Sequence, residues 1–178
     1  MVFRQSHRPV VPPAERLLLR ARRFIQISKF GKAAALLAEL ANQVETAGRP
    51  KAAAELHARA AYCYVEGGIA SAALAETSFA LASFQEAGLT ERLGRFQGNM
   101  LRKMQSHAMQ AGVDALHAQF GTGEGEINPE SHAAAAGKQL ILPAACPECG
   151  APVHSAEIEW IDERSAECAY CGAIFGAQ

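Results

Sequence analysis

The chain has 178 residues, of which 49% are hydrophobic, and a formal net charge of −1. This length and apolar content suit one or two small globular domains and exclude a disordered chain. The longest apolar runs, such as 17–19 and 69–75, are far shorter than the roughly 20 residues that span a bilayer, so we expect no membrane insertion. The N-terminus shows no apolar stretch or cleavage site of a signal peptide, which predicts a cytoplasmic protein.

The small net charge hides a gradient along the chain. Residues 1–32 hold eight Lys or Arg against one Glu, a net charge of +7, whereas residues 114–178 hold two basic residues against ten acidic ones, a net charge of −8. Residues 33–113 are balanced, with seven charges of each sign. Because an acidic C-terminal segment repels phosphate, we do not expect this part to bind nucleic acid.

The first part of the chain predicts a flexible arm followed by helices. Prolines at 9, 12 and 13 break any helix in residues 1–13. Strong helix formers separated by Gly-rich or Pro-containing turns then predict an α-helical domain over residues 14–120. Its expected helices cover about 14–27, 32–47, 51–66 and 70–87, with a fifth that begins near residue 90. Gly112 is expected to kink or end this fifth helix before Val113, Leu116 and Phe120 continue its pattern.

Apolar residues at helical spacing predict the core of this domain. Ala53, Leu56, Ala60 and Cys63 fall on one face of the third helix, spaced three, four and three residues apart. This position makes Cys63 a core residue rather than a nucleophile. Gly-rich phosphate-binding loops after a strand are also missing from the sequence, and we expect no enzymatic activity.

A shift of 40 residues superimposes Ala33 on Ala73 and Gly48 on Gly88. Small residues where helices would cross, with Ala61, Tyr64 and Ala80 at matching places, make residues 14–120 resemble tetratricopeptide repeats. The spacing is longer than the family's, which is about 34 residues. The resemblance implies an array of helical hairpins whose grooves bind a protein partner, and a closed helical bundle is the alternative. Residues 121–142 follow as a linker rich in Gly and acidic residues.

The most specific motif is a pair of C-x-x-C sequences with 18 residues between them, formed by Cys146, Cys149, Cys168 and Cys171. This spacing is typical of four-thiolate metal sites, and a Gly after each pair permits a turn with positive φ. Residues 143–178 therefore resemble a zinc ribbon with rubredoxin-like knuckles, in which a hairpin turn is expected at 162–165. The resemblance implies a structural Zn²⁺, with Fe less favoured, and leaves His154 as a surface residue rather than a ligand.

Together these patterns predict a mostly α protein, a helical hairpin array or bundle followed by a small β-rich zinc ribbon. We expect a non-catalytic accessory or assembly protein that binds a protein partner, and a homo-oligomer remains open. The predicted contact residues are Arg16, Arg20 and Arg23 on one face of the first helix, with Trp160 and Ile161 on the ribbon hairpin. Two alternatives remain: a nucleic-acid-associated zinc-ribbon factor in transcription or RNA machinery, and an iron-binding, rubredoxin-like electron-transfer protein.

Overall fold

The computed structural model describes residues 13–121 and 141–176, except 155–157 and 163. The predicted arm over residues 1–13 therefore lies outside the described residues, apart from Pro13, which is the first residue of a helix. The predicted linker over 121–142 also lies outside them, apart from its first residue and its last two.

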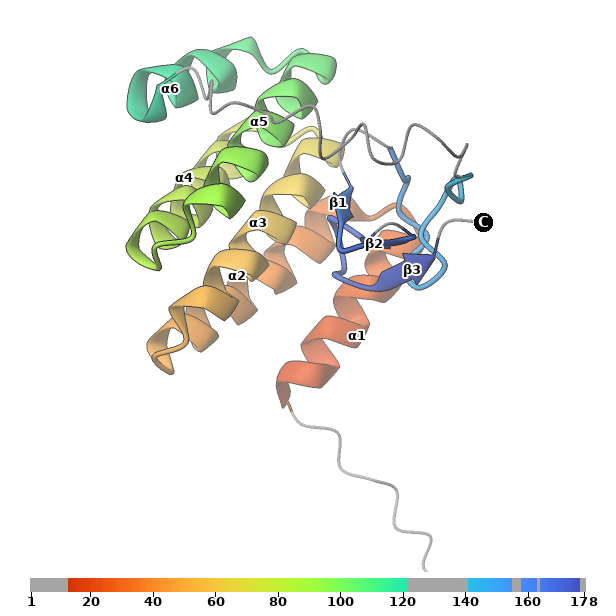
Figure 1. Cartoon of the computed structure of the whole chain (residues 1–178). Helices are drawn as coiled ribbons and strands as arrows, with labels where there is room; N and C mark the ends of the chain where they lie inside the picture. The colour runs from red at the N-terminus through yellow and green to blue at the C-terminus, as the bar shows by residue number, and fades with distance from the viewer. Residues whose placement is uncertain (1–12, 122–140, 155–157, 163, 177–178) are drawn as a thin grey trace, which may run out of the picture.

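The described chain is mostly helical and ends in a small sheet, as the sequence predicts (Figure 1). The helices are α1 (Pro13–Gln26), α2 (Phe30–Thr46), α3 (Pro50–Glu66), α4 (Ala70–Glu86), α5 (Thr90–Ser106) and α6 (Gln110–Phe120). Each helix packs against the next one along the chain, with further contacts between α3 and α5 and between α4 and α6. None of these helices combines the length and apolar character needed to cross a membrane.

The turns between the helices share one geometry. Helices α2 to α6 begin at residues 30, 50, 70, 90 and 110, each 20 residues after the one before. In the turn after α2 the Arg49 N–H donates to the Val44 carbonyl at 3.1 Å, and the Gly48 N–H donates to the Glu45 carbonyl at 2.8 Å. This pair of hydrogen bonds is the Schellman motif that caps helix C-termini. Gly48 has a φ of 72°, in the left-handed region that glycine adopts without steric cost.

The fifth predicted helix is two helices in the structure. Helix α5 ends at Ser106, and the turn at 107–109 repeats the same hydrogen bonds with Ala108 at a φ of 55°. Gly112, expected to kink or end the helix, lies inside α6 instead. The prediction failed because no Gly or Pro marks this turn: an alanine occupies the left-handed position that glycine fills in the three preceding turns.

Small side chains fill most of the helix interfaces. Fully buried alanines occur along α2, α3 and α4, and they let neighbouring helices approach closely; they include Ala33, Ala34, Ala41, Ala53, Ala54, Ala60, Ala61, Ala73 and Ala80. Larger apolar side chains, such as Leu81, Phe84, Phe96 and Met100, fill the space between α3, α4 and α5. Cys63 is fully buried, so its predicted place in the core is confirmed.

The C-terminal residues 141–176, here called the C-terminal module, form a three-stranded antiparallel sheet in the order β1-β2-β3. Its strands are β1 (Glu159–Trp160), β2 (Ser165–Glu167) and β3 (Ile174–Gly176). At the predicted hairpin turn between β1 and β2, the Asp162 carboxylate accepts hydrogen bonds from the N–H groups of Arg164 and Ser165, both at 2.7 Å. Figure 1 shows the module beside the upper ends of α1 and α3.

Candidate metal centre

Each cysteine pair lies in a tight turn, and the two turns have the same hydrogen bonds. In the first turn the Gly150 N–H donates to the Cys146 carbonyl at 2.8 Å, and in the second the Gly172 N–H donates to the Cys168 carbonyl at 2.9 Å. Gly150 and Gly172 have φ values of 71° and 69°, so the predicted positive-φ positions are confirmed. The two turns therefore present their sulfur atoms in equivalent ways.

The structure brings the four predicted cysteines together. All four sulfur atoms lie within 4.8 Å of one another, and the residues that carry them are buried. The Cys146–Cys171 and Cys149–Cys168 sulfur pairs are both 3.8 Å apart. A tetrahedron of sulfur atoms around a metal at about 2.3 Å has edges of about 3.8 Å, whereas a disulfide bond is about 2.05 Å long. The cluster therefore has the size and the donor atoms to hold one metal ion.

The four sulfur atoms lie close enough to shift the pKa values of one another's thiols. Hydrogen bonds with Cys149 and Cys168 lower the pKa of Cys171, and the backbone of Ala173 acts in the same direction. Hydrogen bonds with Cys168 and Cys171, together with burial, raise the pKa of Cys149. Thiols must lose their protons to bind a metal, so metal affinity falls as the pH is lowered.

The fifth cysteine is separate from this cluster in its chemistry. Cys63 on α3 is fully buried, and burial first, then the nearby Cys168 sulfur, raises the pKa of its thiol above the ordinary value. A thiol held in its protonated form is a poor nucleophile and a poor metal ligand. Cys63 is therefore a packing residue behind the site rather than a fifth ligand.

Tyr170, within the second cysteine turn, anchors the module to the helices. Its ring is buried, with ring centroids 5.9 Å from Tyr62 on α3 and 6.3 Å from Phe30 on α2. Its hydroxyl donates to the Glu66 carboxylate at the end of α3, at 2.7 Å. Because Tyr170 stands between Cys168 and Cys171, this anchor and the metal site share one short stretch of backbone.

Glu66 also holds a buried lysine. Lys103 Nζ on α5 lies 2.6 Å from the Glu66 carboxylate and 5.5 Å from the centre of the Tyr170 ring, and its side chain is 1% exposed. Burial alone would raise the pKa of Glu66, but hydrogen bonds from Lys103 and Tyr170 and the charge of Lys103 hold it below its ordinary value. Glu66 is thus a carboxylate that links α3, α5 and the module.

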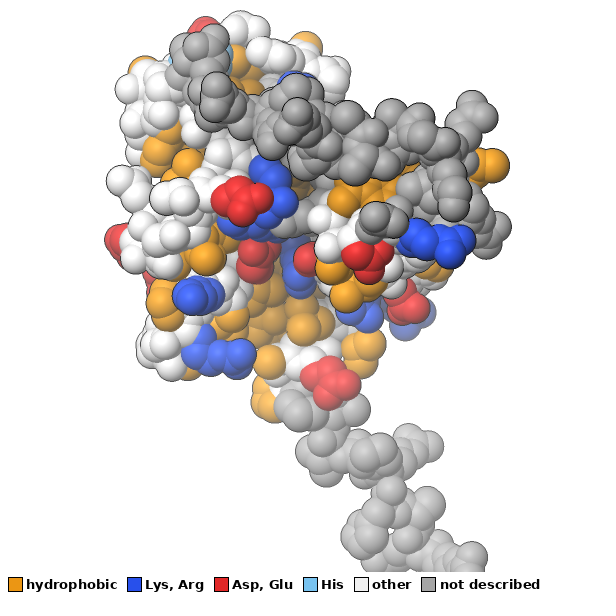
Figure 2. All heavy atoms as spheres, in the orientation of Figure 1, with side chains coloured by type: hydrophobic (Ala, Val, Ile, Leu, Met, Phe, Trp, Pro, Cys, Tyr) orange, Lys and Arg blue, Asp and Glu red, His pale blue; other side chains and the backbone are white. Residues whose placement is uncertain are grey.

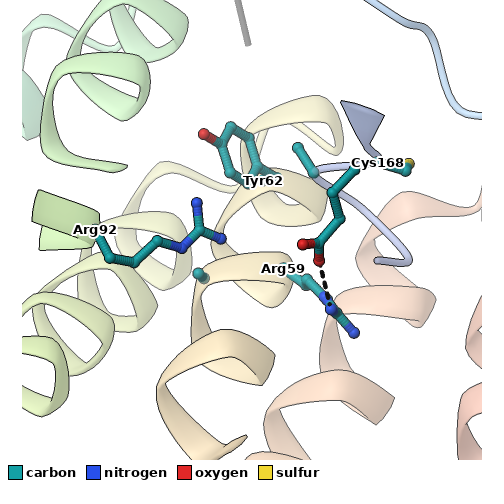
Figure 3. A pocket seen from close by; sticks show the side chains of 7 residues that line it. Arg59, Tyr62, Arg92 and Cys168 are labelled. Carbon is teal, nitrogen blue, oxygen red and sulfur yellow. Dashed lines mark hydrogen bonds and ion pairs between the residues drawn. The ribbon is translucent and has the colours of Figure 1, made fainter. Parts of the chain in front are cut away.

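Arg59 makes the second contact between α3 and the module. Its guanidinium donates to the Glu167 carboxylate at 3.0 Å, and it covers the second cysteine turn so closely that a Cβ atom at Gly172 would overlap it. A small hollow lies beside this pair, and the Arg92 guanidinium reaches into it from α5 (Figure 3). Arg92 is itself held by two hydrogen bonds to the Glu55 carboxylate, at 3.0 and 2.7 Å.

The first cysteine turn contacts α1. The Gln26 side chain donates to the Glu148 carbonyl at 2.9 Å, and the Arg22 guanidinium lies 3.9 Å from the Glu148 carboxylate. Figure 2 shows charged side chains of both signs gathered where the helices meet the module, above a recess whose floor is mostly apolar. Both cysteine turns therefore rest on the helices, and the charge gradient of the sequence is partly neutralised within the chain.

The predicted contact residues lie on two separate elements. Arg16, Arg20 and Arg23 are exposed on α1, where the Arg20 guanidinium packs over the Phe24 ring at 5.6 Å. On the module, Ile161 is 51% exposed while Trp160 packs partly against the core. His154 is exposed and belongs to no metal-ligand cluster among the described residues. A role for the three arginines and the hairpin in partner binding stays a prediction.

Sequence reasoning missed the residues that dock the module onto the helices. These are Gln26, Arg59, Glu66, Lys103, Glu167 and Tyr170. One signal was present: Lys103 follows Phe96 and Met100 at spacings of four and three, which places a charge on the apolar side of α5. A lysine there needs a buried carboxylate, but the sequence does not tell which one.

Comparison of the chain with protein families, with curated proteins and with solved structures found no match.

We expect Gly172→Ala to destabilise the protein by about 1–3 kcal/mol, because a side chain there is strained at positive φ and displaces Arg59 from the second cysteine turn. Gly176→Ala is the matched control: the nearest atom to its added Cβ is the Arg164 carbonyl oxygen at 3.7 Å. Urea denaturation of the metal-loaded protein measures both changes. Equal losses in the two variants would contradict the packing of Arg59 on Gly172.

We expect Glu66→Gln to destabilise the protein by about 3 kcal/mol, since it removes the negative charge that lies 2.6 Å from the buried ammonium group of Lys103. The control is Glu91→Gln, which removes the charge of a carboxylate that is 85% exposed and 3.7 Å from Arg95; it should change stability little because water screens that pair. Free energies of unfolding from urea titrations test the difference. A Glu66→Gln variant as stable as Glu91→Gln would show that the stability of the fold does not depend on the charge of Glu66.

Proposed function

We propose that this chain is a non-catalytic accessory protein, built on a structural zinc ribbon and a helical scaffold, that binds a protein partner. The observation that carries the proposal is the cluster of four buried cysteine sulfurs within 4.8 Å of one another, of which two pairs lie at the 3.8 Å edge length of a metal–thiolate tetrahedron. Four thiolates suit Zn²⁺, because they occupy all four positions of its tetrahedral coordination shell.

A filled coordination shell argues for structure rather than catalysis. Catalytic zinc sites keep a position for water or substrate, and four protein thiolates leave none. A module of this size has too small a core to fold unaided, so the free energy of metal binding serves as its folding free energy. The tight turns around Gly150 and Gly172 and the sheet of three short strands fit that role.

The helices supply the scaffold for recognition. Their 20-residue spacing gives a 40-residue helical hairpin, which supports the tetratricopeptide-like interpretation with a longer repeat. We place the partner on the exposed arginines of α1, Arg16, Arg20 and Arg23, and on the hairpin at Trp160 and Ile161. A reduced four-thiolate site also suits the cytoplasm, where thiols stay reduced.

Metal analysis tests the site. Protein purified without added metal should contain one zinc ion per chain and be colourless, and Cys146→Ser/Cys171→Ser should lose the metal together with the fold of the module. The expected loss is complete because each variant sulfur is one of four ligands. Elemental analysis, a visible spectrum and amide NMR of the module measure these effects. Stoichiometric iron with thiolate-to-iron absorption would favour the electron-transfer alternative instead.

Affinity capture from nuclease-treated extract of the source cells tests the partner. The wild-type chain should retain a protein, and Arg16→Glu/Arg20→Glu/Arg23→Glu should bind it about tenfold more weakly, which corresponds to roughly 1.4 kcal/mol. Arg49→Glu/Arg102→Glu is the matched control, with exposed arginines on α5 and on the turn after α2. A protein captured from untreated extract but not from nuclease-treated extract would favour the nucleic-acid alternative. Equal capture by the α1 variant and by the control variant would exclude the arginines of α1 as the contact.

A further inference from the structure

The contact between the C-terminal module and the helices differs in kind from the contacts among the helices. The helices join through buried alanines and large apolar side chains. The module joins them through a mixed interface, in which its apolar side chains, above all the Tyr170 ring, share the buried cluster of the helices. Three polar contacts add to it: Arg59 with Glu167, Glu66 with Tyr170, and Gln26 with the Glu148 carbonyl. Under the proposed function, metal binding supplies the folding free energy of the module, whereas the contacts among the helices include none of the four cysteine ligands. Loss of metal therefore acts on the module first and leaves the contacts among the helices in place.

The face that the module covers has its own chemistry. We define the docking face as Arg22, Gln26, Phe30, Arg59, Tyr62, Glu66 and Lys103. Its cationic groups meet carboxylates or an aromatic ring of the module: Arg22 faces Glu148, Arg59 faces Glu167, and Lys103 lies over the Tyr170 ring. A ligand that makes the same contacts as the module carries acidic groups and a tyrosine.

The metal site controls whether the module can present those groups. Tyr170 lies between two of the cysteines, Glu167 directly precedes one, and Glu148 lies inside the first pair. Their positions depend on the two cysteine turns, which a metal would hold together. Without it, the module loses the geometry that places the three side chains on the docking face.

Resting on the proposed function, we propose that the C-terminal module is a metal-held cover on the docking face, and that loss of metal frees this face for an acidic, tyrosine-containing segment of a partner protein. The module occupies the face in the metal-loaded chain. The partner segment takes the same contacts with Arg59, Lys103 and Glu66 when the module leaves. Binding of this acidic segment to the docking face and binding of metal to the cysteines then oppose each other, because the metal-held module covers the same face.

The test uses the full chain and a defined probe, a fluorescein-labelled random copolymer of glutamate and tyrosine. Fluorescence anisotropy measures its affinity for the metal-loaded protein and for protein freed of metal by a chelator. We expect the chelated protein to bind the copolymer at least about tenfold more tightly, equivalent to roughly 1.4 kcal/mol. Far-UV circular dichroism of the same samples should show that the helices persist.

Two substitutions locate the binding. In the chelated chain, Arg59→Glu should abolish most of the gain because it puts a like charge against the probe. Arg102→Glu is the matched control, an exposed arginine on α5 bonded to Asn99, and should keep the gain. Tyr170→Ala should raise copolymer binding about fivefold in the metal-loaded chain, without chelator, because it removes the anchor while all four cysteines remain.

The possible results separate this inference from the proposed function. A chain that binds no metal refutes the proposed function. A chain that binds zinc but gains no affinity for the copolymer on chelation, or gains affinity that Arg59→Glu leaves unchanged, overturns the inference alone. Loss of the helical signal on chelation also overturns it, since the module would then be part of the core that the helices need. If metal-loaded Tyr170→Ala binds the copolymer as weakly as the wild type, Tyr170 does not hold the module on the docking face.

Discussion

The geometry of the C-terminal module follows from one constraint: four sulfur atoms must share a space only a few ångströms across. Two turns from distant parts of the chain meet there, with Cys146 against Cys171 and Cys149 against Cys168 at 3.8 Å. Four thiolates this close to one another repel unless a cation neutralises them. The left-handed glycines at 150 and 172 and the three short strands all serve to hold these two turns in register.

The helical part obeys a different and more local constraint. Its turns repeat because the same double hydrogen bond closes each helix, from the turn after α1 to the turn after α5. Equal turns and helices of 17 residues make successive helices stack in the same way, and buried alanines keep them close. The stacked helices bring Arg22 of α1, Arg59 of α3 and Lys103 of α5 to the face that receives the module.

Local patterns in the sequence predicted the local features. Neighbouring residues alone determine the cysteine turns, the positive-φ glycines after each pair and the hairpin turn at Asp162. The structure confirms all three predictions. The end of α5 was misplaced because Ala108 adopts a conformation that sequence patterns assign to glycine. The docking contacts could not be read at all, since Arg59 and Glu167 are 108 residues apart and Glu66 and Tyr170 are 104 apart. Such pairs form through tertiary packing, and they produce no periodic pattern in the sequence from which they could be predicted.

The packing of the module on the helices brings the two ends of the charge gradient together. A basic first helix and an acidic C-terminal segment look like separate interaction surfaces in the sequence. In the structure, Arg22 of the first helix lies 3.9 Å from Glu148, so one end of the charge gradient faces the other within the chain. Arg59 of α3 adds a second ion pair with the acidic segment, at Glu167. The arginines at 16, 20 and 23 remain exposed beyond the module. Because the same helix carries both kinds of arginine, a partner that binds α1 from outside comes close to the contact that holds the module in place.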